Sequence, residues 1–250
     1  WLDYDSHGAH SHRDGMNLGL FAHGLDLLPE MGYPAVQFGG WQSPKGRWYG
    51  RTAAHNTVVV DGKDQSNGTG ETTLWLTEAP LQGIRARGAA MNGDQRYERT
   101  ALLIDVDETH FYVVDVFRVA GGERHTKFVQ SHFGALSTEG IAPEGAADFG
   151  HETQTRNFQL DAKATSGWWG RWTYEDLYEL LPKDATVGMT YTELTNDAQG
   201  GTSEAWIAMG GYDGTESKWI PRLVVDRVGA NLNSTFVSVY APHTGSESGL

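Results

Sequence analysis

The stretch YERTALLIDVDETHFYVVDVFRV, residues 97–119, decides the fold class of this chain. Its two halves are rich in Val, Ile, Tyr and Phe, which suit a pleated surface that is buried on one face. The polar residues Asp107 and Glu108 separate the halves. This pattern predicts two long antiparallel strands joined by a turn, a β-hairpin.

Short apolar runs bounded by Gly, Asn and Asp recur along the chain and predict further strands. They fall at residues 16–21, 56–61, 73–77, 82–88, 127–133, 154–160, 187–192, 205–210, 222–228 and 235–240. Residues 174–181, YEDLYELL, show the apolar spacing of a short helix that Pro182 would end. We therefore expect an all-β fold, a large antiparallel multi-sheet β-sandwich. It would form one domain over residues 1–250, with any minor division near a polar loop at residues 137–150.

Composition excludes several functions. The formal net charge of -13 repels phosphate backbones and anionic membrane surfaces, so we expect no nucleic-acid partner. No apolar run approaches the length of about 18 residues that a spanning helix needs, so we expect no membrane insertion. The chain has no cysteine, which leaves His, Asp and Glu as the strong metal ligands.

The densest chemical signal is HGAHSHRDG, residues 7–15. If this segment is extended, His10, His12 and Asp14 project to one face, because strand side chains alternate. Zinc without thiolate ligands is typically held by His residues and a carboxylate. His12, with the later residues Glu30 and His55, could supply such a set. Individually these residues could equally be solvated loop or turn residues.

The order of these pieces resembles the heparinase II/III-like polysaccharide lyases. The matching segments are residues 10–14 (HSHRD), 29–32 (PEMG) and 55–62 (HNTVVVDG), all within roughly the first 65 residues. The chain departs from the family pattern at Glu30, where the carboxylate is usually Asp, and at Ser11, where Gly is usual. The resemblance implies a β-sandwich that packs against an N-terminal α/α toroid missing from this chain.

The resemblance also implies a role for each matching residue. His12, Glu30 and His55 would bind Zn2+, His10 would line the catalytic cleft as acid/base or charge neutraliser, and Asp14 would orient an imidazole. The expected reaction is β-elimination in a uronic-acid polysaccharide, with a periplasmic or secreted location. The acidic polymer and the toroid would be the chain's partners.

Residues 39–52, GGWQSPKGRWYGRT, interleave aromatic and basic side chains. Aromatic faces stack on sugar rings, and Arg can bind a carboxylate through two hydrogen bonds. The candidate substrate contacts in this stretch are therefore Trp41, Arg47, Trp48 and Arg51. Arg13 is a further candidate carboxylate contact, and Asn56 is expected either to contact substrate or to support the groups that do. The glycines and Pro44 favour an exposed loop here, although the Trp residues could instead be core anchors.

Two alternatives to a lyase remain open at this point. The chain could be a non-catalytic, zinc-stabilised carbohydrate-binding β-sandwich. It could also be a cupin-like metalloenzyme, since an H-x-H pair followed by Glu and His suits that ligand pattern too. A compact barrel of the cupin type would leave the second half of the sequence unexplained.

Overall fold

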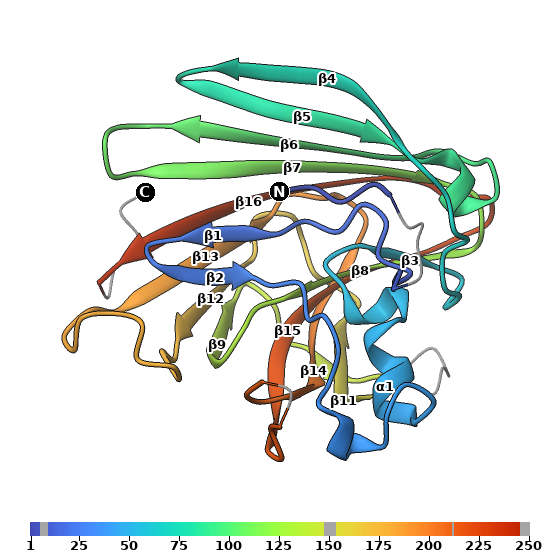
Figure 1. Cartoon of the computed structure of the whole chain (residues 1–250). Coiled ribbons are helices and arrows are strands. Elements are labelled where there is room, and N and C mark those ends of the chain that lie inside the picture. Colours follow the sequence, from blue (N-terminus) through green and yellow to red (C-terminus); the bar gives the residue numbers. More distant parts are fainter. Residues whose placement is uncertain (6–9, 148–153, 212, 246–250) are drawn as a thin grey trace.

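The computed structural model describes residues 1–5, 10–147, 154–211 and 213–245. Within this part the chain folds mainly into antiparallel strands, which form two large sheets and one small hairpin (Figure 1). The expected all-β, multi-sheet fold is confirmed. The hairpin predicted over residues 97–119 is also present, with Tyr97 paired to Val119 and Asp105 paired to Phe111.

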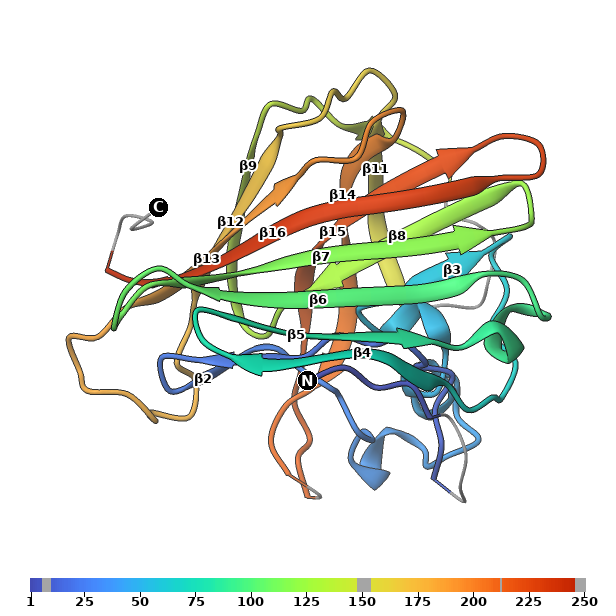
Figure 2. The same ribbon diagram turned by 90° about the horizontal axis from the view of Figure 1, so that it is seen from above.

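The larger sheet has eight strands. In spatial order its strands are β4 (Glu71–Glu78), β5 (Leu81–Arg87), β6 (Tyr97–Asp105), β7 (Phe111–Ala120), β16 (Asn233–Thr244), β13 (Val187–Glu193), β12 (Trp169–Tyr174) and β9 (Gly134–Glu139). In Figure 1 strands β4 to β7 lie at the top, and β13, β12 and β9 lie lower, beside and below the small hairpin. Figure 2 shows β6, β7 and β16 running side by side through the middle of this sheet.

The smaller sheet has six strands. In spatial order they are β10 (Glu144–Gly145), β11 (Thr155–Asp161), β14 (Gln199–Ala208), β15 (Ser217–Val228), β8 (Arg124–Gln130) and β3 (Val58–Val60). A separate hairpin pairs β1 (Leu20–Ala22) with β2 (Leu25–Leu28). Of the polar loop expected at residues 137–150, residues 148–150 lie outside the described residues. The remainder contains the end of β9 and all of β10, so it carries the chain from the larger to the smaller sheet.

One hydrophobic core lies between the two sheets. It joins Phe117 and Phe236 of the larger sheet to Val129 and Leu223 of the smaller sheet, and all four side chains are buried. The alternation of buried and partly exposed residues along β7 explains this arrangement, since one face of the strand meets the core. The predicted hydrophobic strands thus become the inner faces of a sandwich.

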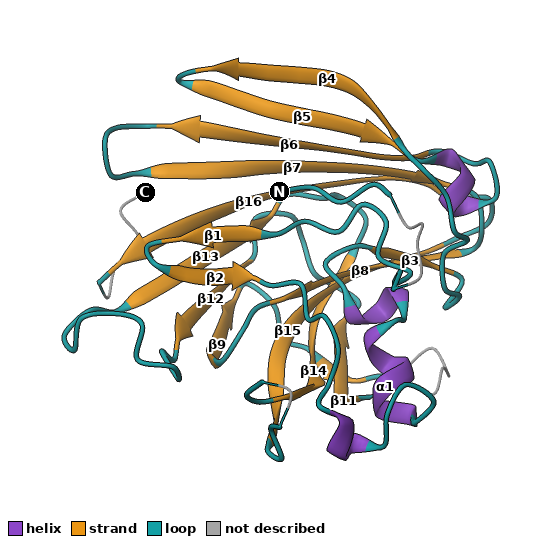
Figure 3. Ribbon diagram, viewed as in Figure 1, coloured by secondary structure: helices purple, strands orange, loops and turns teal. Residues whose placement is uncertain are grey.

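A second core covers the opposite face of the smaller sheet. It is built by the helix α1 (Pro44–Tyr49) and the 3-10 helix η2 (Thr52–Ala54), which pack on β8, β14 and β15. The other short helical segments are η1 (Val36–Phe38) and η3 (Ala89–Asn92), and Figure 3 shows how little of the ribbon is helical. Residues 44–54, which lie between the candidate ligands Glu30 and His55 in the sequence, therefore cover one face of the smaller sheet.

A fully buried charge network also crosses the space between the sheets. Arg99 donates to both carboxylate oxygens of Asp115 at 2.7 and 2.8 Å, and the Lys127 ammonium lies 2.9 Å from the same carboxylate. The third guanidinium nitrogen of Arg99, Nη1, donates to the backbone carbonyls of Met16 at 2.6 Å and Asn56 at 2.5 Å. The network therefore ties β6, β7 and β8 to the two segments that carry the candidate metal ligands.

Two local predictions were wrong. Residues 174–181 form no helix: β12 ends at Tyr174, and the Asp176 carboxylate instead accepts hydrogen bonds from the backbone of Leu180 and Leu181. Leu180 is exposed, so a helix at this place would have no neighbouring surface to cover its apolar face. Residues 44–49, expected in a loop, form α1 because Ser43 accepts from Gly46 as an N-cap and Pro44 occupies the first turn.

Candidate metal centre and active site

The segment that carries His10, His12 and Asp14 is a loop, not the extended strand that the side-chain alternation assumed. His12 and Asp14 are nevertheless both buried, whereas His10 is exposed. The loop is fixed by a backbone hydrogen bond from Arg13 to the Gly50 carbonyl. Ser11, which replaces the usual Gly, has no positive φ, so a side chain is tolerated there.

Four potential metal ligands converge behind this loop. His12, Asp14, Glu30 and His55 each offer a ligand atom, and these four atoms lie within 4.8 Å of one another. His12 and Asp14 come from the loop before β1, Glu30 follows β2, and His55 follows η2. The structure thus brings together the three ligands expected from the sequence and adds Asp14 to them.

The hydrogen bonds of His55 indicate that a cation belongs between it and Glu30. Its Nε2 lies 2.9 Å from the Tyr49 carbonyl, which can only accept, so Nε2 carries the hydrogen. The Nδ1 atom then faces Glu30 Oε2 at 3.0 Å with its lone pair when the ring is neutral. Two acceptors at this distance require a proton or a metal ion between them. A metal-binding His typically donates its other N–H to a carbonyl in this way.

The His12 side chain gives the same indication. Its Nδ1 lies 3.3 Å from Glu30 Oε1, and its buried Nε2 has no hydrogen-bond partner among the described residues. Glu30 therefore reaches both imidazoles with its two oxygens, which the longer side chain permits. The donor set of imidazoles and carboxylates fits Zn2+.

The titration properties of the cluster agree with a shared positive charge. Burial alone raises the pKa of Glu30, but the charge of His55 and hydrogen bonds from His12 and His55 hold that pKa well below its usual value. Burial by itself lowers the pKa of His55, but the negative charge of Glu30 has the larger effect. The net result is a raised pKa of His55. Without metal, His55 holds the proton that a metal ion would replace.

Asparagine side chains hold the ligands in place. The Asn17 amide donates to Glu30 Oε2 at 2.7 Å, and its carbonyl oxygen accepts from the Asn56 backbone at 2.8 Å. The Asn56 side chain accepts from the Gln130 backbone of β8 at 2.7 Å. Asn56 is fully buried, so of its two expected roles the structure favours the supporting one over contact with substrate, and it links the site to the smaller sheet.

An aromatic cavity of about 390 Å³ adjoins the metal cluster and is lined in part by His10, Tyr33 and Trp41. The ring centroids of His10 and Trp41 are 5.2 Å apart, those of Tyr33 and Trp41 4.4 Å, and those of Tyr33 and His12 4.7 Å. The Tyr33 hydroxyl donates to the His10 carbonyl. Tyr33 was not predicted from the sequence, although it follows Glu30 by only three residues, which places its backbone near the site.

The predicted substrate contacts in residues 39–52 divide into two groups. Trp41 is 54% exposed at the cavity, as an open loop would allow. Trp48 is fully buried and donates its indole N–H to the Trp206 carbonyl, so its expected sugar contact is wrong. Helix α1 turns that side chain into the second core, which a loop would not do.

The three candidate arginines differ in their surroundings. Arg13 donates to the Gln65 carbonyl at 3.0 Å, and Arg51 lies 3.3 Å from the Asp64 carboxylate. Arg47 is exposed in the last turn of α1. Arg47 is the exposed one of the three and follows Gly46, which lines the aromatic cavity, so its side chain is open to an acidic ligand.

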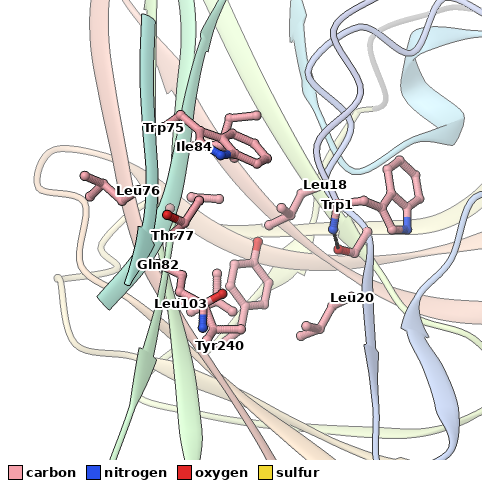
Figure 4. Close-up of a pocket in the computed structure, with 14 residues that line it drawn as sticks. Trp1, Leu18, Leu20, Trp75, Leu76, Thr77, Gln82, Ile84, Leu103 and Tyr240 are labelled. Atoms are coloured by element: carbon pink, nitrogen blue, oxygen red, sulfur yellow. Dashed lines mark hydrogen bonds between the residues drawn. The ribbon is translucent and has the colours of Figure 1, made fainter. Parts of the chain in front are cut away.

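Another cavity, of about 240 Å³, lies between the N-terminal segment and the larger sheet (Figure 4). Trp1 and Trp75 stand on opposite sides of it, with Tyr240 between them. Its lining is mainly apolar and includes none of the predicted site residues. The chemistry therefore centres on the metal cluster and its aromatic cavity. No helix in the described residues is long and apolar enough to cross a membrane.

Solved structures of heparinases share this fold. A heparinase III gene product aligns with a TM-score of 0.65 and 15% identity over 98% of this chain and 32% of its own. The heparan sulfate lyase HepC from Pedobacter heparinus aligns with a TM-score of 0.60 and 14% identity, again over 98% of this chain and 32% of its own. The chain thus spans about a third of these structures.

No curated protein sequence matches the chain. The model of the family described as heparinase II/III-like, C-terminal, matches residues 3–176, which include all four members of the metal cluster and the aromatic cavity residues His10, Tyr33 and Trp41. This match is difficult to reconcile with a cupin-like metalloenzyme, and the two-sheet sandwich likewise differs from a single compact barrel. The chain belongs to the heparinase II/III-like C-terminal family.

Proposed function

We propose that this chain supplies the zinc site and one wall of the active-site cleft of a polysaccharide lyase that cleaves uronic-acid polymers by β-elimination. The observation that carries the proposal is the aromatic cavity, in which His10, Tyr33 and Trp41 lie directly beside the metal cluster. Membership of the family supports the lyase class. The similar solved structures include a heparinase III and a heparan sulfate lyase, which supports an acidic polysaccharide as substrate.

The zinc ligands would be His12, Glu30 and His55, with Asp14 either orienting an imidazole or completing the set. A bound zinc ion would supply positive charge and join the loop before β1 to the segments after β2 and η2. Because the ligands are largely buried and the cavity is lined by other residues, its main contribution here is to hold His10 and Tyr33 in position.

β-Elimination removes the proton at C5 of the uronate, forms the C4–C5 double bond and breaks the bond from C4 to the leaving oxygen, which takes up a proton. The negative charge that develops on the uronate carboxylate must be stabilised. His10 can act as base or charge neutraliser, because its ring is exposed at the cavity. Arg47 is the proposed carboxylate contact, and Trp41 offers an exposed ring for a sugar face.

Tyr33 is suited to donate the proton to the leaving oxygen. Burial, with the nearby charges of Asp14 and Glu30, raises the pKa of Tyr33, so its hydroxyl stays protonated at neutral pH. The hydroxyl now donates to the His10 carbonyl, and substrate would compete for it. Proton donor and base would then lie on one wall of the cleft.

The opposite wall would come from an N-terminal α/α toroid, as the greater length of the similar structures allows. We place the protein in the periplasm or outside the cell, where its polymer would be found. This arrangement makes the chain alone an incomplete enzyme.

The test is an absorbance assay for the unsaturated uronate product, run with the longest native polypeptide that contains this chain against a panel of uronic-acid polymers. His10→Ala should abolish product formation while zinc content stays the same, and Ser11→Ala, a neighbouring change away from the cavity, should leave activity intact. Product formation that survives His10→Ala would remove His10 from the mechanism. If no polymer yields the unsaturated product while the protein still binds zinc and sugar, the non-catalytic carbohydrate-binding alternative would be favoured.

A further inference from the structure

The loop between β14 and β15 forms part of the aromatic cavity beside the metal cluster, although the proposed mechanism gives it no role. Figures 1 and 2 place this loop next to the segment that joins β2 to α1. Gly210 and Gly211 of the loop line the cavity together with His10, Tyr33 and Trp41. One part of the cavity wall is therefore backbone without side chains, supplied by residues far along the chain.

Hydrogen bonds hold this wall in place. The backbone N–H of Gly214 donates to the Gly211 carbonyl at 2.9 Å, and the backbone N–H of Gly210 donates to the Tyr178 hydroxyl at 3.0 Å. The Tyr178 ring makes a T-shaped contact with the buried ring of Phe133, with the centroids 6.0 Å apart. Because Phe133 belongs to the second core, Tyr178 anchors the cavity wall to that core.

Four glycines line the cavity, and the structure requires three of them. Gly40 and Gly210 have φ values of 71° and 78°, in the left-handed region that favours glycine. A Cβ atom at Gly46 would lie 2.3 Å from the Gly40 carbonyl oxygen, so close packing excludes a side chain there. Gly211 has no positive φ, and a Cβ atom on it would meet no described atom within 4 Å. Backbone strain and packing therefore leave Gly211 unexplained.

The space beside Gly211 is open to a ligand of the cavity. Trp41 offers an exposed ring for a sugar face in the same cavity, and none of the residues that line it is acidic. We propose that Gly211 is a specificity-determining residue of this cleft. The missing side chain leaves room for a substituent on the sugar ring that is larger than a hydroxyl group, a sulfate or an acetamido group. This inference rests on the proposed function, since it assumes that the cavity binds a polysaccharide.

Tyr178 is a positioning residue for the same wall. Tyr178→Phe keeps the ring contact with Phe133 but removes the acceptor for the Gly210 backbone. The side chain is 49% exposed, so water can take the place of the hydroxyl without cost to the fold. KM for the substituted sugar should rise while kcat stays the same, because the wall binds the substrate and transfers no proton.

The test compares two uronic-acid oligosaccharides of equal length, one with the substituent and one without, on the longest native polypeptide that contains this chain. Separate pairs carry the sulfate and the acetamido group, so the pair that responds identifies the substituent. Gly211→Val should lower kcat/KM by about tenfold or more for the substituted member and by less than about threefold for the other. The matched control is Gly145→Val in β10, where φ is not positive and a Cβ atom would meet no described atom within 4 Å. This control should change neither value.

Titration calorimetry with the same oligosaccharides separates this inference from the proposed lyase activity. It is run in the His10→Ala background, so that the ligand is not cleaved, and Gly211→Val should weaken binding of the substituted member by the same factor. Ligands that bind without yielding product in the His10 protein would refute the lyase and leave the Gly211 comparison to decide this inference.

Three results would overturn the proposal about Gly211, each with zinc content and circular dichroism as in the unsubstituted protein. The first is an equal loss for both members of every pair in Gly211→Val. The second is an unchanged affinity for both members. The third is the failure of every oligosaccharide to bind, which would show that the cavity holds no sugar.

Discussion

Arg99 links the buried charges between the sheets to the backbone of the metal centre, and the variant Arg99→Met tests that link. Methionine keeps a similar apolar length but removes the guanidinium. The change takes away two hydrogen bonds to Asp115 and the donors to the carbonyls of Met16 and Asn56. Met16 lies close to Asp14 in the sequence, and Asn56 follows His55.

The expected loss of stability follows from the burial of the pair. Arg99 and Asp115 are both completely buried, and breaking such a pair costs about 3–5 kcal/mol because one charge stays behind. Lys127 remains 2.9 Å from Asp115, so the lower end of that range applies. For a chain of this length, about 3 kcal/mol corresponds to a fall of about 6–12 °C in the unfolding temperature.

Zinc affinity should also fall, by about tenfold, because groups that orient metal ligands typically have effects of this size. The matched control is Lys127→Met. Lys127 shares the Asp115 carboxylate, but its other hydrogen bond goes to Ser238 and not to the metal-site backbone. Lys127→Met should therefore lower stability without changing the zinc affinity of the folded chain.

The measurements are denaturant unfolding in the presence of a chelator and zinc titration against a competing chelator, both at a temperature where each variant is folded. Equal losses of zinc affinity in Arg99→Met and Lys127→Met would refute the link, since only Arg99 contacts the Met16 and Asn56 carbonyls. A loss of stability below about 1 kcal/mol in Arg99→Met would refute the burial argument.

Three further predictions concern single side chains. Asn17→Ala removes the donor to Glu30 and should weaken zinc binding about 10-fold in a chelator competition, and an unchanged affinity would count against the Asn17 role. Burial raises the pKa of Asp115, but Arg99 and Lys127 outweigh it and hold the pKa at about 2. The pKa of Asp115 in the folded chain lies below its value in the unfolded chain, so the stabilisation is complete above about pH 4 and is lost as the pH falls toward 2. The free energy of unfolding, measured against pH, should show this loss. The Asp115→Asn variant should not show it. Trp48→Ala should lower the free energy of unfolding, measured with denaturant, by about 3–5 kcal/mol. Trp41→Ala should change that free energy by no more than about 0.5 kcal/mol and should weaken polysaccharide binding. The reverse pattern would contradict the assignment of Trp48 to the core.

Local sequence patterns predicted the fold class and three of the four residues that form the candidate metal cluster. The hairpin of β6 and β7 was predictable because β-branched and aromatic residues alternate on either side of a polar turn, and this signal is contained in neighbouring residues. His12, Glu30 and His55 were identified by residue type and order, since few side chains can ligate zinc in a chain without cysteine. The contribution of Asp14 as a fourth nearby ligand was not fixed by that order.

Only the tertiary structure decided what each remaining side chain faces. Trp41 and Trp48 have similar neighbours in the sequence, yet one is exposed at a cavity and the other is buried, because α1 turns Trp48 onto the smaller sheet. The helical spacing of residues 174–181 failed for the converse reason, since no neighbouring surface covers Leu180. Tyr33 gains its place beside His10 and His12 through the fold of the loop after β2. Sequence patterns report local backbone preference, whereas burial and the meeting of distant side chains depend on packing across the whole chain.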